Sequence, residues 1–240
     1  MITDYELMNI HVQALFTQNS ESRLLFVNEP GGTTTARASR MFLGRTRAGN
    51  VWRFRTDLPE NLCEELAALC ADEPVVEEFG DEPPRYAENY LRLLEQHAPV
   101  AQQKPETGPA YQFTEYAKQS NRAVVIVTEN NAAEILRGGF EDFASELPDW
   151  QPFVAFVENN RAVSICRSAR ITAEAHEAGV ETLPDFRGKG YAAAVTAEWA
   201  RLVRDAGAIA LYSTGWENVA SQAVARKLNL RHYGTDFHIA

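Results

Sequence analysis

The segment that decides the fold is residues 180–192, which read VETLPDFRGKGYA. It lies between an extended run, 174–183, and a long helical pattern, 191–206. Glycines just before a helix let backbone N–H groups approach a bulky anion, which the free amides and dipole of the helix N-terminus attract. Arg187 and Lys189 add positive charge, so we expect a pyrophosphate-binding turn. The alternative is a tight strand-to-helix turn that carries two solvated cations.

The second half of the chain alternates strand and helix patterns. Asn159-Asn160 favours a hairpin because Asn tolerates positive φ, Gly207 is placed to end a helix, and Asn218 is a candidate helix N-cap. The pattern predicts a mixed α/β domain over 106–240. We expect strands at 123–128, 152–158, 161–167, 174–183, 209–214 and 231–239, helices at 191–206 and 218–228, and a helical pattern over 131–147 that Gly138-Gly139 breaks.

The first half predicts a smaller α/β unit over 1–105. Thr3 and Glu6 have the spacing of a capping box at the start of a helix, and Pro59 is suited to the first position of a second helix. We expect strands at 22–27, 41–46 and 50–55, helices at 59–70 and 85–97, an acidic loop at 72–88 and a linker at 98–109.

Residues 187–192, Arg-Gly-Lys-Gly-Tyr-Ala, resemble the Arg/Gln-x-x-Gly-x-Gly/Ala motif of the GNAT superfamily of acyl-CoA-dependent N-acyltransferases. The likeness extends over about 120–240 and includes the pattern that runs from Asn218 through Ser221 to Ala225-Arg226-Lys227-Leu228. It implies a GNAT-like α/β fold with a mixed sheet, acetyl-CoA as co-substrate and no metal. Residues 1–105 resemble only the extra N-terminal halves of some members, so we predict a degenerate GNAT-like half there.

The resemblance also implies which residues contact acetyl-CoA. The backbone of Val180, Glu181 and Thr182 would pair with the pantetheine arm like an added strand. Asn218 would contact the pantetheine or order the last helix, and Ser221 belongs to the same surface. The backbone N–H groups of the motif would hold the pyrophosphate, with cofactor contacts at Arg187, Gly188, Lys189, Gly190, Tyr191 and Ala192.

Acetyl transfer to an amine needs a base, because an alkylamine has a pKa near ~10.4 and arrives protonated. Glu181 is the candidate, since it lies on the strand that matches the CoA-binding strand of the family; the alternative is an ordinary solvent-facing residue. Glu174, His176 and Glu177 share this segment. By strand alternation, His176 points to the opposite face from Glu177 and Glu181.

The departing CoA thiolate needs a proton, which many GNAT enzymes take from a tyrosine in the last helix. Ala225 stands at that position here, so Tyr212, Ser221 and solvent are the alternatives. We expect an N-acetyltransferase that moves acetyl from acetyl-CoA to a primary amine through a ternary complex. The rival hypotheses are a non-catalytic acyl-CoA-binding or regulatory module, and a phosphate-binding protein unrelated to CoA.

The amino-acid composition limits which binding partners and which cellular compartment we expect for this protein. The chain has 240 residues, of which 45% are hydrophobic and 23% charged, and a formal net charge of −10 disfavours nucleic acid. The last 80 residues are the exception, with 10 basic and 8 acidic residues. Neither a membrane-length apolar run nor a basic leader occurs, and three cysteines are too few for a disulfide framework. We expect a cytoplasmic enzyme with a small-molecule or peptide amine acceptor and no membrane partner; a homodimer is left open.

Overall fold

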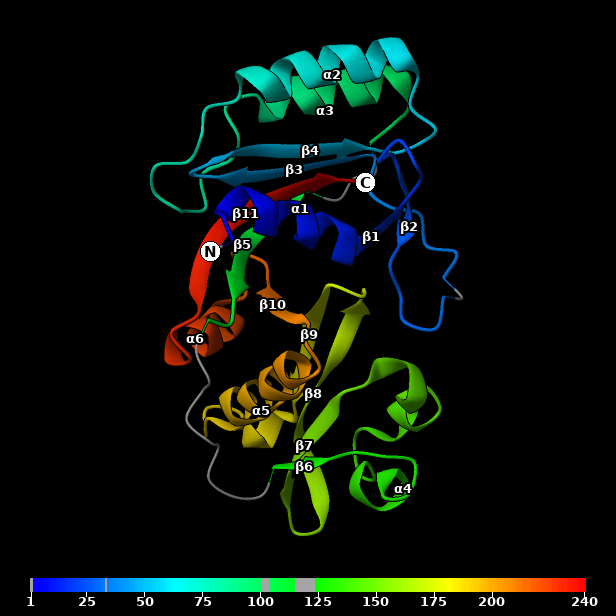
Figure 1. The fold of residues 1–240 in the computed structure, drawn as a ribbon, viewed down its shortest axis with the longest axis vertical. Coiled ribbons are helices and arrows are strands. Elements are labelled where there is room, and N and C mark those ends of the chain that lie inside the picture. The colour runs from blue at the N-terminus through cyan, green and yellow to red at the C-terminus, as the bar shows by residue number, and fades with distance from the viewer. Residues whose placement is uncertain (1, 33, 101–103, 115–123) are drawn as a thin grey trace.

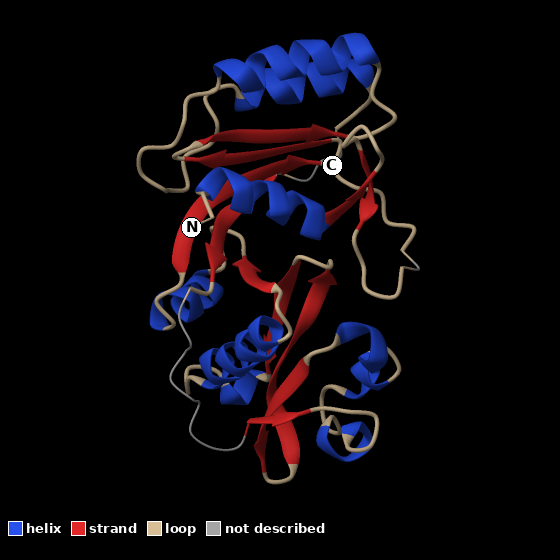
Figure 2. Cartoon of the chain, viewed as in Figure 1, coloured by secondary structure: helices blue, strands red, loops and turns tan. Residues whose placement is uncertain are grey.

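The computed structural model describes residues 2–32, 34–100, 104–114 and 124–240. The fold is mixed α/β, as the sequence predicts, with a nine-stranded sheet of order β4-β3-β11-β5-β10-β9-β8-β7-β6 and a small antiparallel pair, β1-β2 (Figures 1 and 2). The strands are β1 (Phe16–Gln18), β2 (Leu24–Val27), β3 (Met41–Thr46), β4 (Gly49–Phe54), β5 (Glu106–Gln112), β6 (Val124–Ile126), β7 (Phe153–Glu158), β8 (Arg161–Ile171), β9 (Ala175–Thr182), β10 (Ile209–Ser213) and β11 (Arg231–Ile239).

Local signals placed most helices correctly. The capping box predicted at Thr3 and Glu6 is present, and Asn218 caps the last helix by accepting a hydrogen bond from the backbone N–H of Ser221 at 3.0 Å. Asn159 and Asn160 both have positive φ in the β7–β8 hairpin. The helices are α1 (Asp4–Leu15), α2 (Glu60–Asp72), α3 (Ala87–His97), α4 (Ala132–Ile135), α5 (Tyr191–Asp205) and α6 (Val219–Lys227).

Two predictions are wrong, and one is confirmed. The linker expected at 98–109 contains the start of β5, which pairs with β10 on one side and β11 on the other. The helical pattern over 131–147 is broken at Gly138 and Gly139, as predicted: it comprises the short α4 and, after these two glycines with positive φ, 3₁₀ turns at Glu141–Ala144 and Leu147–Trp150. Pro59 is the N-cap residue of α2, one position before the first helical residue, Glu60, and not itself the first helical residue.

One sheet runs through both predicted domains. β11, from the chain's C-terminal end, lies between β5 and β3, so the strands of the N-terminal unit extend the same ladder. The division at residue 105 and the degenerate GNAT-like half therefore stay predictions, but the two parts share a backbone hydrogen-bond network (Figure 1).

Helices cover the two faces of the sheet. Along β10, Leu211 packs in the cluster that contains α1 residues, whereas Ala210 and Tyr212 pack in the cluster that contains α5 residues. Because successive side chains of a strand point to opposite faces, α1 and α5 lie on opposite sides of this part of the sheet. Figure 1 shows α2 and α3 as a further layer beside β3 and β4.

Candidate active site

The site begins where two parallel strands part. β9 and β10 pair in register up to Glu177, opposite Leu211, and no further pair joins them in the described part of the chain. Beyond this point β9 stays paired with β8 as far as Thr182, and β10 stays paired with β5 as far as Ser213. The backbone edge of residues 178–182 that faces β10 is thus without a strand partner, which leaves a slot in the sheet.

A cavity of about 740 Å³ opens at this slot. It brings together three segments that are far apart in sequence: the end of β9, the turn into α5 and the exposed side of α6. All but one of the sequence-predicted cofactor residues line it, and both predicted catalytic residues do so as well: Val180, Glu181, Thr182, Arg187, Gly188, Gly190, Tyr191, Ala192, Tyr212, Asn218 and Ser221.

The turn into α5 has the geometry of an anion cradle. Gly188 and Gly190 have φ values of +76° and +85°, which L side chains rarely adopt, and Gly190 is the N-cap of α5. The first N–H groups of a helix have no acceptor within it, so those that follow Gly190 are available to an anion. The side chain of Arg187 donates to the carbonyl of Thr182 at 3.2 Å, which ties the turn to β9.

The lysine side chain that lines the cavity is Lys227, and not Lys189 as the sequence predicts. Lys189 lies outside the cavity lining, and its Nζ sits 4.7 Å from the centroid of the Phe186 ring. The backbone N–H of Lys189 stays a predicted pyrophosphate contact. Lys227, at the end of α6, lines the cavity instead, and its Nζ is 2.5 Å from where a Cβ on Gly190 would lie. Sequence reasoning missed Lys227, although it belongs to the pattern that follows Ala225.

The aromatic ring of Tyr191 is fixed at the rim. It stacks on Phe156 with centroids 4.1 Å apart and an interplanar angle of 18°, and its hydroxyl donates to Glu158. This pairing raises the pKa of Tyr191. The first residue of α5 is therefore anchored to β7, which holds the cradle at a fixed distance from the sheet.

A part-buried pair of hydroxyls lies between β10 and α6. The hydroxyls of Tyr212 and Ser221 are 2.6 Å apart, and Asn218 holds the backbone of Ser221. Burial raises the pKa of Tyr212 to about 12, so its hydroxyl is protonated at neutral pH. Ala225 is buried one turn further along α6. The hydroxyl of Tyr212 reaches α6 from the neighbouring strand, β10.

Two carboxylates of β9 project from the face opposite α5. Glu181 has a side chain that is 47% exposed and pairs with Arg167 at 3.0 Å. Glu177 stands at the last paired position before the slot, is 4% exposed, and accepts a hydrogen bond from the Ser213 hydroxyl at 3.4 Å. His176 points the other way, as predicted, and its Nδ1 is 2.9 Å from the Ser168 hydroxyl.

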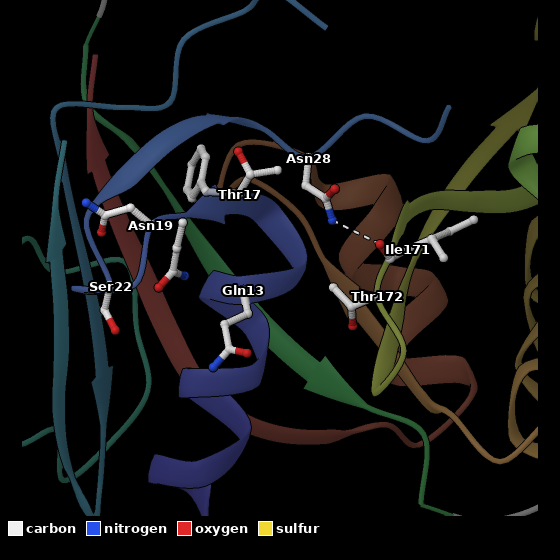
Figure 3. A pocket seen from close by; sticks show the side chains of 9 residues that line it. Gln13, Thr17, Asn19, Ser22, Asn28, Ile171 and Thr172 are labelled. Carbon is white, nitrogen blue, oxygen red and sulfur yellow. Dashed lines mark hydrogen bonds between the residues drawn. The ribbon is translucent and has the colours of Figure 1, made fainter. Parts of the chain in front are cut away.

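A second cavity, of about 440 Å³, lies where the N-terminal unit meets the end of β8. Figure 3 shows its lining of amide and hydroxyl side chains, with Asn28 donating to the carbonyl of Ile171 at 3.1 Å. None of the residues that line it carries a formal charge. An anion such as a pyrophosphate would find no cation there, which leaves the first cavity as the candidate for a phosphorylated ligand.

Other features of the described residues are structural. Cys63, Cys70 and Cys166 are buried and unpaired, in the core rather than at the site. Among the residues with described positions, no group of His, Cys, Asp or Glu could hold a metal ion. Within the same part of the chain, each helix is too short or too polar to cross a membrane.

A parted pair of parallel strands, a glycine turn at a helix N-terminus and carboxylates on the opposite face form a site with the shape and the free N–H groups that suit a long phosphorylated ligand. The sequence model of the family described as GNAT acetyltransferase matches residues 112–235, which is more than half of the chain. The protein therefore belongs to the GNAT acetyltransferase family and is a transferase that takes its acyl group from an acyl-CoA.

Several solved structures are similar to this chain at low sequence identity. A Drosophila protein superposes with a TM-score of 0.50 at 9% identity, over 98% of this chain and 86% of its own. A GCN5-related N-acetyltransferase-like protein from Streptococcus suis has a TM-score of 0.48 at 15% identity and covers 85% of each chain. A GNAT-family protein from Novosphingobium aromaticivorans has a TM-score of 0.46 at 13% identity. The match covers 57% of this chain and 64% of that protein. No curated protein matches the sequence.

Proposed function

We propose that this protein transfers an acetyl group from acetyl-CoA to a primary amine in a ternary complex. The observation that carries the proposal is the arrangement of the slot: the 740 Å³ cavity is lined by the end of β9, including Glu181, and by α5 and α6, whereas Glu177 lies outside this lining, on the face of β9 opposite α5. A thioester in the slot would be open to an amine that arrives from the carboxylate side.

The cofactor contacts follow from the unpaired edge of β9. The pantetheine amides would pair with the backbone of Val180 and Thr182 on the side that faces β10, as an added strand does. The pyrophosphate would bind the N–H groups around Gly188 and Gly190, with Lys227 supplying a cation. Asn218 and Ser221 would border the pantetheine from α6.

The reaction needs a proton acceptor on the amine side. The amine nitrogen attacks the thioester carbonyl, a C–N bond forms, the C–S bond breaks, and one amine proton must leave. Glu181, the candidate from sequence, is exposed and already paired with Arg167. Glu177 lies where β9 and β10 separate, so it is nearest to a thioester seated in the slot. We assign the base to Glu177, acting directly or through one water, and keep Glu181 as the alternative.

Tyr212 is the proposed partner of the leaving thiolate. With a pKa of about 12 it stays protonated, but a thiol has an ordinary pKa of about 8.5, so full transfer of its proton would be uphill by roughly 5 kcal/mol. Tyr212 would therefore stabilise the thiolate by a hydrogen bond, aided by its 2.6 Å contact with Ser221, while solvent supplies the proton.

The function is tested by measuring free thiol from acetyl-CoA in the presence of amino acids, polyamines, aminoglycosides and peptides. We expect release that depends on one amine class. Glu177→Gln should lower kcat about 10²–10⁴-fold, the usual contribution of a general base, whereas Glu181→Gln should cost less than about tenfold. CoA affinity, measured by calorimetry, should hold in both variants. The reverse order would assign the base to Glu181, and CoA binding without thiol release from any amine would contradict the proposal.

A further inference from the structure

A histidine from the N-terminal helix lies directly behind the proposed base. His11 of α1 is fully buried, with its Nδ1 2.7 Å from the Glu177 carboxylate and its Nε2 2.9 Å from the Asp236 carboxylate. The three residues come from α1, β9 and β11. Glu177 is thus held on one side by His11 and on the other by the Ser213 hydroxyl at 3.4 Å.

The charges around His11 make it a cation. Burial lowers the pKa of its imidazole, but the hydrogen bonds to Asp236 and Glu177 outweigh burial and raise the pKa to about 9. Other titratable groups near these residues are His238 and Tyr233 of β11 and Tyr212 of β10. The Nε2 of His238 is 3.5 Å from Asp236, the Tyr233 hydroxyl is buried with no hydrogen-bond partner in the described structure, and Tyr212 interacts electrostatically with Glu177. His11, Glu177 and Asp236 are hereafter the triad.

We propose that His11 is a positioning residue of the acyl-transfer centre. The N-terminal unit would then complete the active site, because its His11 orients the Glu177 carboxylate and provides its counter-ion. The inference rests on the proposed function, in which Glu177 takes the amine proton. In the resting triad one imidazolium lies between two carboxylates, so the net charge is −1. When the proton that leaves the amine nitrogen is taken up by a Glu177 oxygen, the triad becomes neutral, and no new buried charge is created.

A purely structural role explains the triad less well. Buried ion pairs are often replaced by apolar residues at no loss of stability, because desolvation offsets their attraction. Elsewhere the two parts of the chain are joined by ordinary means, including the Glu29–Arg170 pair at 3.2 Å, which does not contact Glu177. The triad differs from this ion pair because its cation, His11, contacts Glu177, the carboxylate at the point where β9 and β10 separate.

The test is the pH dependence of kcat at saturating acetyl-CoA and amine, in the full-length protein. In His11→Gln the imidazolium beside Glu177 is lost, so the acid limb of the pH profile should move to higher pH and kcat at pH 7 should fall. Asp236→Asn removes the competing carboxylate and leaves the cation to Glu177 alone, so the acid limb should move down. Glu29→Gln is the matched control and should keep the parent profile.

Shifts of opposite sign separate the inference from a loss of packing, which would lower kcat in both variants without moving either limb. CoA affinity by calorimetry confirms that each variant is folded; if His11→Gln does not fold, the downward shift in Asp236→Asn still decides. An active parent whose acid limb is unmoved in the folded variants would overturn the inference alone. A parent that binds CoA but acetylates no amine would overturn the proposed function and the inference with it.

Discussion

Replacing Gly190 by Ala probes the cradle with a built-in control. Gly190 has a φ of +85° at the start of α5, and Gly207, just after the end of the same helix, has a φ of +88° with no atom within 4 Å of an added Cβ. Both substitutions place an L side chain in the left-handed region, which costs roughly 1–2 kcal/mol. For a chain of this size, that should lower the melting temperature by about 2–8 °C in either variant.

The two variants should differ in CoA binding. At Gly190 the new methyl group would lie 2.5 Å from the Lys227 Nζ and would also narrow the cradle. If the pyrophosphate loses one charge-assisted hydrogen bond, worth about 1.5–3 kcal/mol, the Kd rises about 10- to 150-fold. Gly207→Ala should leave the Kd unchanged.

The assay is calorimetry with CoA, run beside thermal unfolding of the parent and both variants. Equal losses of melting temperature show that the strain is matched, so any difference in Kd belongs to the cradle. The reasoning is refuted if Gly190→Ala binds CoA within about threefold of the parent. It is refuted equally if Gly207→Ala weakens binding as much, because backbone strain alone would then account for the loss.

Three further predictions concern single side chains. Tyr212→Phe should lower kcat by no more than about 100-fold, the value of a hydrogen bond to a charged group, in stopped thiol-release assays; a loss above 10³-fold would make it a true proton donor. Lys227→Gln should raise the Kd of CoA about tenfold but leave pantetheine binding unchanged, and equal losses for both ligands would remove Lys227 from the phosphate site. The raised pKa of His11 stabilises the fold fully below about pH 6.5, and this contribution, on the order of 3 kcal/mol, is lost as pH rises through about 9. Urea unfolding should therefore show a steeper loss from pH 6.5 to 9.5 in the parent than in His11→Gln, and identical slopes would contradict a charged His11.

Several parts of this protein could be predicted from neighbouring residues. The cap of α1 joins Thr3 to Glu6, and the cradle joins Gly188 and Gly190 to the helix that follows them directly. Such features depend on contacts between residues a few positions apart, or on the φ that one residue type allows. That is why the motif, the hairpin at 159–160 and most of the residues that line the larger cavity could be predicted before the fold was known.

β5 shows where such reasoning stops. Its residues include Gly108 and Pro109, which are depleted in strands, so the segment resembles a linker. In the structure it lies inside the sheet, where a Cβ on Gly108 would be 1.7 Å from the Thr214 carbonyl oxygen. A glycine is required there because of a neighbour more than 100 positions away along the chain.

The sequence by itself determined the family, the glycine turn before α5 and the strand that carries the carboxylates, because each of these depends on consecutive residues. Only the tertiary structure decided which carboxylate lies at the opening of the slot and what holds it. His11 is separated from Glu177 by 166 positions and from Asp236 by 225. No local pattern relates residues so far apart. They meet because α1 packs against both β9 and β11 of the same sheet. Burial then leaves the two carboxylates no better partner than the imidazolium between them.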